Sequence, residues 1–198
     1  MKQLNSHQFE EVYKDLKINL DDLGCIMLDL EPLNIDHWIG QDGVSSYTLG
    51  FPFYYARNKT RFWIDGWVAG KVPHITLLYG LLDQARIDFE SNIEKVLEGW
   101  KLEEVEIEDF RVFDSPYGDE PYYCVVAHIK KTDELLEGHN RLEFLPHINT
   151  FTGYKPHMTI AYIEKSAEIA KDNLVADLKR EFIGKKLKVK SLNFGGNK

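Results

Sequence analysis

The chain has 198 residues, a formal net charge of −8 at pH 7 and an apolar content of 43%. These values fit one globular domain spanning residues 1–198, built as a single body or as two halves that share a core. The acidic balance argues against a protein that coats duplex DNA, because such binding needs clustered Lys and Arg to neutralise many phosphates. A small nucleotide or a short RNA end remains compatible as a partner.

Cysteine usage and the first residues of the chain bear on the compartment. Only Cys25 and Cys124 are present, without a CxxC pattern, so neither a disulfide framework nor a structural zinc site is indicated. Residues 1–22 alternate charged and apolar side chains and hold no continuous hydrophobic stretch, unlike a secretory signal or a membrane anchor. We therefore expect a soluble, cytoplasmic protein with no membrane partner, and the pattern does not indicate an oligomeric state.

The first half of the chain alternates predicted helices and strands around an aromatic-rich insertion. Apolar spacing predicts, in chain order, a helix at 6–20, a buried strand at 24–30, the insertion at 32–72, a strand at 74–79, a helix at 83–97 and a strand at 104–113. In the last of these strands the apolar residues do not share one face, which indicates a β-bulge.

The second half runs in a similar order. After a turn at 115–119 the pattern predicts a strand at 122–129, a helix marked by Leu135 and Leu142 and ended by Pro146, a strand at 157–163, a helix at 167–182 and a strand at 185–194. Two comparable halves of this kind indicate an α+β fold with two lobes related by an approximate two-fold axis.

The most informative feature of the sequence is a pair of matched segments, one in each half. PHITLLY at 73–79 and PHMTIAY at 156–162 agree in chemical type along their length. Side chains alternate between the faces of a strand, so the His and the Thr of each segment point the same way, roughly 7 Å apart. Each half therefore offers one imidazole and one hydroxyl on a common surface.

His74, Thr76, His157 and Thr159 form a coherent set for cleaving a phosphodiester without a metal ion. Two imidazoles can supply a base and an acid on opposite sides of the phosphorus, as in-line displacement requires. The threonine hydroxyls can donate hydrogen bonds to the non-bridging oxygens, where negative charge sits in the transition state. If the two motif strands lie near each other at the centre of the sheets, as we expect, the approximate symmetry puts His74 and His157 on opposite sides of one cleft. The pattern does not tell which histidine is the base.

The two H-x-[ST] motifs, in a chain with this order of elements over residues 24–194, resemble the two-histidine (2H) phosphoesterase superfamily. The resemblance implies a bilobal fold in which central antiparallel sheets form a cleft with helices outside, and it implies catalytic roles for the His and Thr of both motifs. The superfamily includes RNA 2′,3′-cyclic phosphodiesterases once called 2′-5′ RNA ligases, viral enzymes that cleave 2′,5′-oligoadenylates, and phage anti-CBASS enzymes.

The resemblance also implies an activity. It points to a hydrolase or cyclising nuclease without a cofactor, which acts on an RNA 2′,3′-cyclic phosphate, a 2′-5′ linkage or a cyclic oligonucleotide. If the chain is viral, the expected location is the host cytoplasm.

Outside the motifs, a few aromatic and basic residues are candidates for substrate binding. Tyr54, Trp63 and Trp67 lie in the insertion near alternating basic residues, where they either stack on nucleobases as a lid or pack over a core edge. Lys155, two residues before His157, either meets an anionic ligand or stays solvated.

The other histidines and two tyrosines are assigned to structural roles. Strict alternation places Tyr79 and Tyr162 on the face opposite the motif residues, against the core, unless a bulge intervenes. We expect His128 to cap the core rather than to line the cleft. The remaining histidines fall in polar or loop contexts and are expected at the surface: His7, His37, His139 and His147.

Two alternatives stay open at this stage. In the first, His74, His128 and His157 form a three-histidine zinc site, although nothing then explains the paired threonines. In the second, the same fold is a nucleotide-binding sponge whose histidines grip phosphate without turnover.

Overall fold

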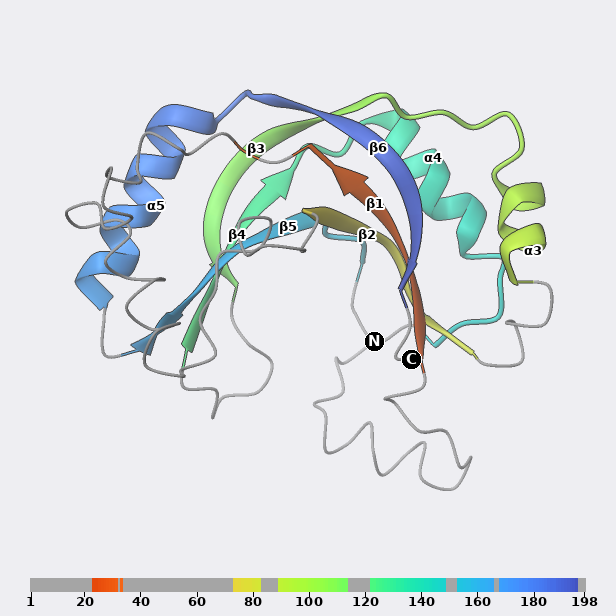
Figure 1. Cartoon of the computed structure of the whole chain (residues 1–198), viewed down its shortest axis with the longest axis horizontal. Coiled ribbons are helices and arrows are strands. Elements are labelled where there is room, and N and C mark those ends of the chain that lie inside the picture. Colours follow the sequence, from red (N-terminus) through yellow and green to blue (C-terminus); the bar gives the residue numbers. More distant parts are fainter. Residues whose placement is uncertain are drawn as a thin grey trace, which may run out of the picture.

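The described part of the chain folds into one curved antiparallel sheet with helices on its outer side (Figure 1). The computed structural model describes residues 23–31, 33, 73–82, 89–113, 122–148, 153–165 and 168–195. The strands are β1 (Gly24–Leu30), β2 (His74–Leu81), β3 (Glu104–Phe113), β4 (Tyr122–Ile129), β5 (His157–Glu164) and β6 (Lys186–Gly195). The helices are α3 (Phe89–Val96), α4 (Asp133–Leu142) and α5 (Glu168–Phe182).

The sheet consists of two halves with the same arrangement. The strand order is β2-β1-β6-β3-β4-β5, so each half runs from a motif strand at the edge, through one strand, to a central strand. The central strands β3 and β6 join the halves by a short antiparallel pairing from Glu104 to Glu106. This arrangement confirms the predicted α+β fold of two pseudo-symmetric lobes.

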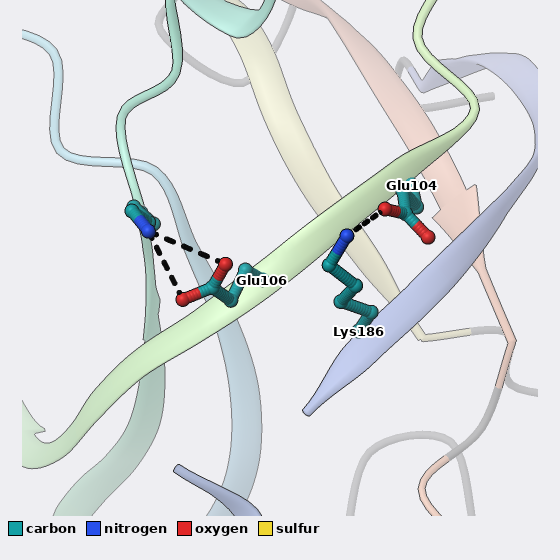
Figure 2. Close-up of polar contacts among 4 residues, drawn as sticks. Glu104, Glu106 and Lys186 are labelled. Atoms are coloured by element: carbon teal, nitrogen blue, oxygen red, sulfur yellow. Dashed lines mark hydrogen bonds and ion pairs between the residues drawn. The ribbon is translucent and has the colours of Figure 1, made fainter. Parts of the chain in front are cut away.

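Charged side chains bridge the junction between the halves. Lys186 on β6 forms an ion pair with Glu104 on β3, and both are shown with Glu106 in Figure 2. Glu106 in turn accepts a hydrogen bond from Lys130 Nζ at 3.1 Å. Only the Lys186–Glu104 pair joins β6 to β3, because Lys130 directly follows β4. These side chains are largely exposed, so each pair contributes little stability.

The helices cover one face of the sheet, and alternate strand residues point toward them. In Figure 1, α5 lies outside β3 and β4, whereas α3 and α4 lie outside the half that contains β2. Strand β1 shows the consequence most simply, because Ile26, Leu28 and Leu30 are buried and the residues between them are half-buried. We call the sheet face away from the helices the open face.

Helix α4 follows β4 in the chain but packs on β2, so it ties the second half to the first. Its start is fixed by Thr132, whose hydroxyl accepts a hydrogen bond from the N–H of Leu135 at 3.2 Å. Acidic residues in its first turn and Arg141 in its last turn match the helix dipole. Leu135 and Leu142 are buried at its sheet side. None of the described helices is long and apolar enough to cross a membrane.

The structure differs from the sequence-based expectation in two respects. Strand 24–30 was expected to be buried, but only one of its faces is covered, because the helices lie on one side of the sheet. The two motif strands were expected at the centre of the sheets and are instead its two edges. The helix predicted at 6–20 and the insertion at 32–72 lie outside the described residues, apart from Leu33, and both stay predictions.

The free edge of β2 is covered by the segment that follows α4. The N–H of Ile148 donates to the carbonyl of Gly80 at 2.8 Å, and the N–H of Leu82 donates to the carbonyl of Pro146 at 3.2 Å. Gly80 makes this close approach with φ of 90°, and a Cβ at this position would overlap the carbonyl oxygen of Ile148. Both the dihedral angle and the contact therefore require glycine.

This contact predicts the cost of a side chain at Gly80. We expect Gly80→Ala to lower the free energy of unfolding by about 3 kcal/mol, because a strained dihedral angle and a backbone overlap act together. Gly99 has φ of 74° with nothing within 4 Å of the position that a methyl group would take, so Gly99→Ala should cost only the dihedral term, about 1 kcal/mol. Urea unfolding of both variants measures the difference, and equal losses would contradict the close packing of β2.

Candidate active site

The His and Thr of each motif lie on the open face of the sheet. On β2, His74 and Thr76 are half-buried, whereas Ile75 and Leu77 are fully buried toward the helices. On β5, His157 and Thr159 are half-buried and alternate with buried Met158 and Ile160. The alternation inferred from the sequence therefore holds in both motif strands.

The two motif strands meet although they are opposite edges of the sheet. The curvature of the sheet brings β2 into contact with β5. His74 and His157 are close enough to interact electrostatically, because His74 contributes to lowering the pKa of His157. The structure thus places the two imidazoles on one surface and within reach of each other's charge.

Tyr154 links the two motifs directly. Its hydroxyl donates a hydrogen bond to the carbonyl oxygen of Thr76 at 3.0 Å, from a position three residues before His157. The ring of His139 stacks on the Tyr154 ring with centroids 3.9 Å apart and an angle of 8° between the planes. The Nδ1–H of His139 donates to the carbonyl of Leu77 at 2.6 Å. Burial raises the pKa of Tyr154, so the phenol keeps its proton and remains a donor.

The expectation that His139 lies at the surface is wrong. Only 13% of its side chain is exposed, because it projects from α4 onto the edge of β2. His147 is half-buried beside the same edge, with Nδ1 donating to the carbonyl of Leu145 at 2.8 Å. Polar sequence context did not reveal these positions, since the free edge of a strand offers carbonyl groups that a histidine can satisfy. His7 and His37 lie outside the described residues.

Both motif strands carry a β-bulge at the residue after the motif threonine. The pairing of β1 with β2 skips Leu77, and the pairing of β4 with β5 skips Ile160. An extra residue reverses the alternation of side chains beyond it. The repetition of the bulge at equivalent positions extends the symmetry of the two halves to their backbone.

The bulge changes the position of Tyr79. Leu77 and Leu78 are both buried, and Tyr79 is 40% exposed opposite Cys25, on the same face as His74. The expectation that Tyr79 packs in the core is therefore wrong, because that expectation assumed unbroken alternation. The side chain of Tyr162 lies outside the described residues, although its backbone pairs with Cys124.

The cross-strand neighbours of the two histidines differ. His74 lies opposite Asp29 on β1, whose carboxylate accepts hydrogen bonds from Ser191 Oγ at 3.2 Å and Asn193 Nδ2 at 3.1 Å. His157 lies opposite His128 on β4, which in turn lies opposite Asp109 on β3. The two halves therefore share one motif but surround it with different charges.

His157 is held as a neutral imidazole with a defined tautomer. Burial lowers its pKa below the usual 6.5, the nearby His74 lowers it further, and only the hydrogen bond to Lys155 acts in the opposite direction. That bond joins His157 Nδ1 to the carbonyl oxygen of Lys155 at 2.8 Å. A carbonyl can only accept, so Nδ1 carries the proton and Nε2 presents a lone pair.

Phe113 and His128 complete the surroundings of His157. The Phe113 ring lies 4.6 Å from the His157 ring and 6.5 Å from the His128 ring, measured between centroids. We expected His128 to cap the core, but it is half-buried on the open face beside His157. Burial lowers the pKa of His128, and electrostatic interactions with Arg111 and His157 lower it further, whereas Asp109 and Glu108 act in the opposite direction.

The predicted substrate-binding residues are only partly placed by the structure. Lys155 is exposed, and its backbone carbonyl rather than its ammonium group contacts His157. Tyr54, Trp63 and Trp67 lie outside the described residues. Asp29, Phe113 and Tyr154 were not singled out in the sequence, because only the strand register and the fold bring them to the motifs.

The three-histidine zinc alternative finds no ligand cluster in the part of the chain that the structure describes. No group of three or more His, Cys, Asp or Glu side chains there lies close enough together to hold a metal ion. Cys25 and Cys124 are half-buried, and they form no disulfide bond with each other.

Family membership follows from a match over most of the described sheet. The family model of the 2′-5′ RNA ligase superfamily matches residues 55–195, which is more than half of the chain. The chain belongs to this superfamily. The superfamily is that of the 2H phosphoesterases, so the resemblance seen in the two motifs is confirmed. Membership supports phosphodiester-cleaving or ligase-like chemistry for this 2H protein.

Two solved structures share the fold of this 2H protein. The structure of Kluyveromyces marxianus Usb1 matches with a TM-score of 0.56 and 10% identity, covering 88% of this chain and 94% of that chain. The structure of the same Usb1 with uridine monophosphate matches with a TM-score of 0.53 and 10% identity, covering 89% and 95%. At this identity the likeness shows the fold alone. Among curated proteins, no sequence matches the chain.

The position of Tyr154 predicts that its hydroxyl can be removed with an effect on turnover but without unfolding the protein. Tyr154→Phe removes the hydroxyl that joins the segment before β5 to the backbone of β2, and should cost about 1 kcal/mol of stability. Because the stacked ring remains, the protein should stay folded while kcat falls more than KM changes. Tyr123→Phe, at a half-buried tyrosine whose ring faces Lys171 of α5, is the matched control and should leave kcat unchanged. Equal kcat in wild type and Tyr154→Phe would contradict the linking role.

The electrostatics of His157 predict a titration measurable by NMR. We expect the imidazole resonances of His157 to titrate below pH 6.5, and His74→Ala to raise that pKa by removing a neighbouring positive charge. The free energy of unfolding should fall at acidic pH, because a histidine whose pKa is lowered by folding binds fewer protons in the folded than in the unfolded chain. Its contribution is complete above pH 6.5 and is lost as the pH falls toward the folded pKa. An unchanged His157 titration in His74→Ala would show that the rings are not coupled.

Proposed function

We propose that this 2H protein is a metal-independent phosphodiesterase that acts on a small nucleotide. The candidate bonds are an RNA 2′,3′-cyclic phosphate, a 2′-5′ linkage and a linkage within a cyclic oligonucleotide. The observation that supports the proposal is the meeting of the two motif strands, which puts His74 and His157 on one open face and within electrostatic reach of each other. Two imidazoles so placed can act on a single phosphoryl group from opposite sides.

His157 is the general base in this proposal, and His74 is the general acid. The neutral state and the Nδ1–H tautomer of His157 leave Nε2 able to accept a proton. For a cyclic phosphate, Nε2 takes a proton from water, the water oxygen bonds to phosphorus, and the bond from phosphorus to one ribose oxygen breaks. His74 gives its proton to that departing oxygen. For an intact linkage, the neighbouring ribose hydroxyl replaces water as the attacking group: the 3′-hydroxyl in a 2′-5′ linkage and the 2′-hydroxyl in a 3′-5′ linkage. The bond from phosphorus to the 5′ oxygen of the next nucleotide then breaks, and His74 protonates that oxygen.

Thr76 and Thr159 hold the phosphoryl oxygens. Both lie on the open face two residues beyond their histidines and on the near side of the bulge in their strand. A hydroxyl from each strand can donate to a non-bridging oxygen, where the transition state concentrates negative charge. The Usb1 structure with uridine monophosphate supports a nucleoside monophosphate as the size of ligand that this fold accommodates.

Substitution of the motif residues tests the proposal. We expect His74→Ala and His157→Ala each to lower kcat by about 10²–10⁴-fold, because each removes a proton-transfer group. Thr76→Val and Thr159→Val should act more mildly, about 10-fold to 100-fold, through a weaker hold on the phosphate. The assay incubates the protein and EDTA with 2′,3′-cyclic mononucleotides, 2′-5′ oligoadenylates and cyclic dinucleotides and separates the products.

The control variant is His147→Ala, which removes an imidazole outside the motifs and should retain turnover. Cleavage that persists in EDTA, with a bell-shaped pH profile, agrees with two titrating imidazoles. Loss of cleavage in EDTA would shift the assignment to the zinc alternative. Saturable binding with intact ligand recovered would shift it to the nucleotide sponge.

A further inference from the structure

Arg111 lies on the open face in the row that contains Thr159. Arg111 on β3 pairs with Val126 on β4, and Val126 pairs with Thr159 on β5. Residues directly opposite in antiparallel strands point to the same face, so the arginine and the threonine share the open face across two strand spacings. The Arg111 side chain is 63% exposed. Its positive charge reaches the site, because it contributes to lowering the pKa of His128 beside His157.

Arg111 belongs to a mixed charge cluster that also contains Asp109, Lys179 and Glu108. Its Nε donates to Asp109 at 2.8 Å, and the same carboxylate pairs with Lys179 Nζ at 2.9 Å. Burial opposes ionisation of Asp109, but the hydrogen bonds from Arg111, Lys179 and the Phe110 N–H outweigh it and lower its pKa to about 2. One carboxylate is therefore shared by two cations. A guanidinium bound through Nε still has N–H donors on its two Nη atoms.

The equivalent position in the first half carries no charge. There the row runs from Thr76 on β2 through Met27 on β1 to Asn193 on β6. Asn193 donates to Asp29, the carboxylate that lies opposite His74. Arg111 therefore offers a cation to a phosphate on one side of the open face, whereas Asp29 offers a carboxylate on the other side. The symmetric frame thus carries an asymmetric electrostatic field.

We propose that Arg111 binds a second phosphate group of the substrate, next to the phosphoryl group held between the two motifs. The proposal rests on the proposed function and narrows its substrate class to nucleotides with at least two phosphate groups. Strands are about 4.8 Å apart, so the backbones at Thr159 and Arg111 are about 10 Å apart. One phosphoryl group held at the motifs does not reach across that span, whereas a second phosphate of the same nucleotide does. The uncharged end of the substrate then lies over the half that contains Asp29.

Binding of phosphomonoesters tests the second phosphate site without any turnover. Calorimetry compares a nucleoside 3′-monophosphate with the matching 3′,5′-bisphosphate, for adenosine and for uridine, because neither compound has a phosphodiester to cleave. The wild-type protein should bind the bisphosphate about tenfold more tightly, the value of one charge-assisted contact. Arg111→Gln should abolish that difference and leave monophosphate binding unchanged.

Arg180→Gln is the matched control. Arg180 is also an exposed arginine, with 75% of its side chain accessible, and it pairs with Asp177 on α5 rather than with a residue of the open face. Its substitution changes the net charge by the same amount and should preserve the preference for the bisphosphate. The affinity of the wild type for the bisphosphate should also fall more steeply with salt than that of Arg111→Gln.

The outcomes separate this inference from the proposed function. No preference for the bisphosphate in the wild type, an equal loss for both ligands in Arg111→Gln, or the same loss in Arg180→Gln would overturn the second phosphate site. A preference that depends on Arg111, in a protein that turns over none of the phosphodiesters, would keep the site and overturn the catalytic proposal. Turnover of a phosphodiester without such a preference would keep the catalytic proposal and overturn the second phosphate site.

Discussion

The site depends on the closure of the sheet that brings its two edges together. In a flat sheet, β2 and β5 would be separated by five strand spacings, about 24 Å, and a single phosphoryl group could not touch both motifs. Curvature removes that separation, and the hydrogen bond from Tyr154 to the Thr76 carbonyl fixes the distance that remains. The carbonyl belongs to a motif residue and the phenol precedes the other motif, so the hydrogen bond connects the two motifs with little intervening chain. Residues 146–148 cover the edge of β2 at the end of the strand away from His74, and so help to hold β2 in place.

Within that closure, symmetry and asymmetry have different roles. The halves repeat the motif, the strand order and a bulge after the motif threonine, and this repetition sets two imidazoles and two hydroxyls around one point. Acid–base catalysis requires the two imidazoles to differ in protonation, which a perfectly symmetric site would not provide. The surroundings differ in this way, because a carboxylate lies opposite His74, whereas a second imidazole and a phenyl ring lie beside His157. Burial, and to a smaller extent the nearby His74, lowers the pKa of His157 and so favours its neutral form.

Much of the fold could be predicted because local patterns determine it. β1, β3 and β4 have the bounds that alternation and turn residues predict, and the bulge in β3 occurs where its apolar residues change face. Sheet order could not be predicted, since pairing of strands distant in the chain depends on tertiary packing rather than on local sequence. That is why the motif strands were expected at the centre and are the edges. Tyr79 was misplaced for a related reason, because the bulge at Leu77 becomes visible only when β2 is aligned with β1.

Local sequence indicates the chemistry of the site, whereas strand pairing decides its selectivity. The proposed reacting groups lie within three consecutive residues in each half, so a motif can reveal them. Residues that surround a substrate are contributed by neighbouring strands, and whether Arg111 or Asp29 stands beside a motif is decided by register alone. A shift of one residue in the pairing of β3 with β4 would turn Arg111 to the helix side without altering either motif. The proposed catalytic groups can therefore stay constant in such a fold while substitutions on β1, β3, β4 and β6 change the proposed ligand, because those strands supply charge to the open face but no motif residue.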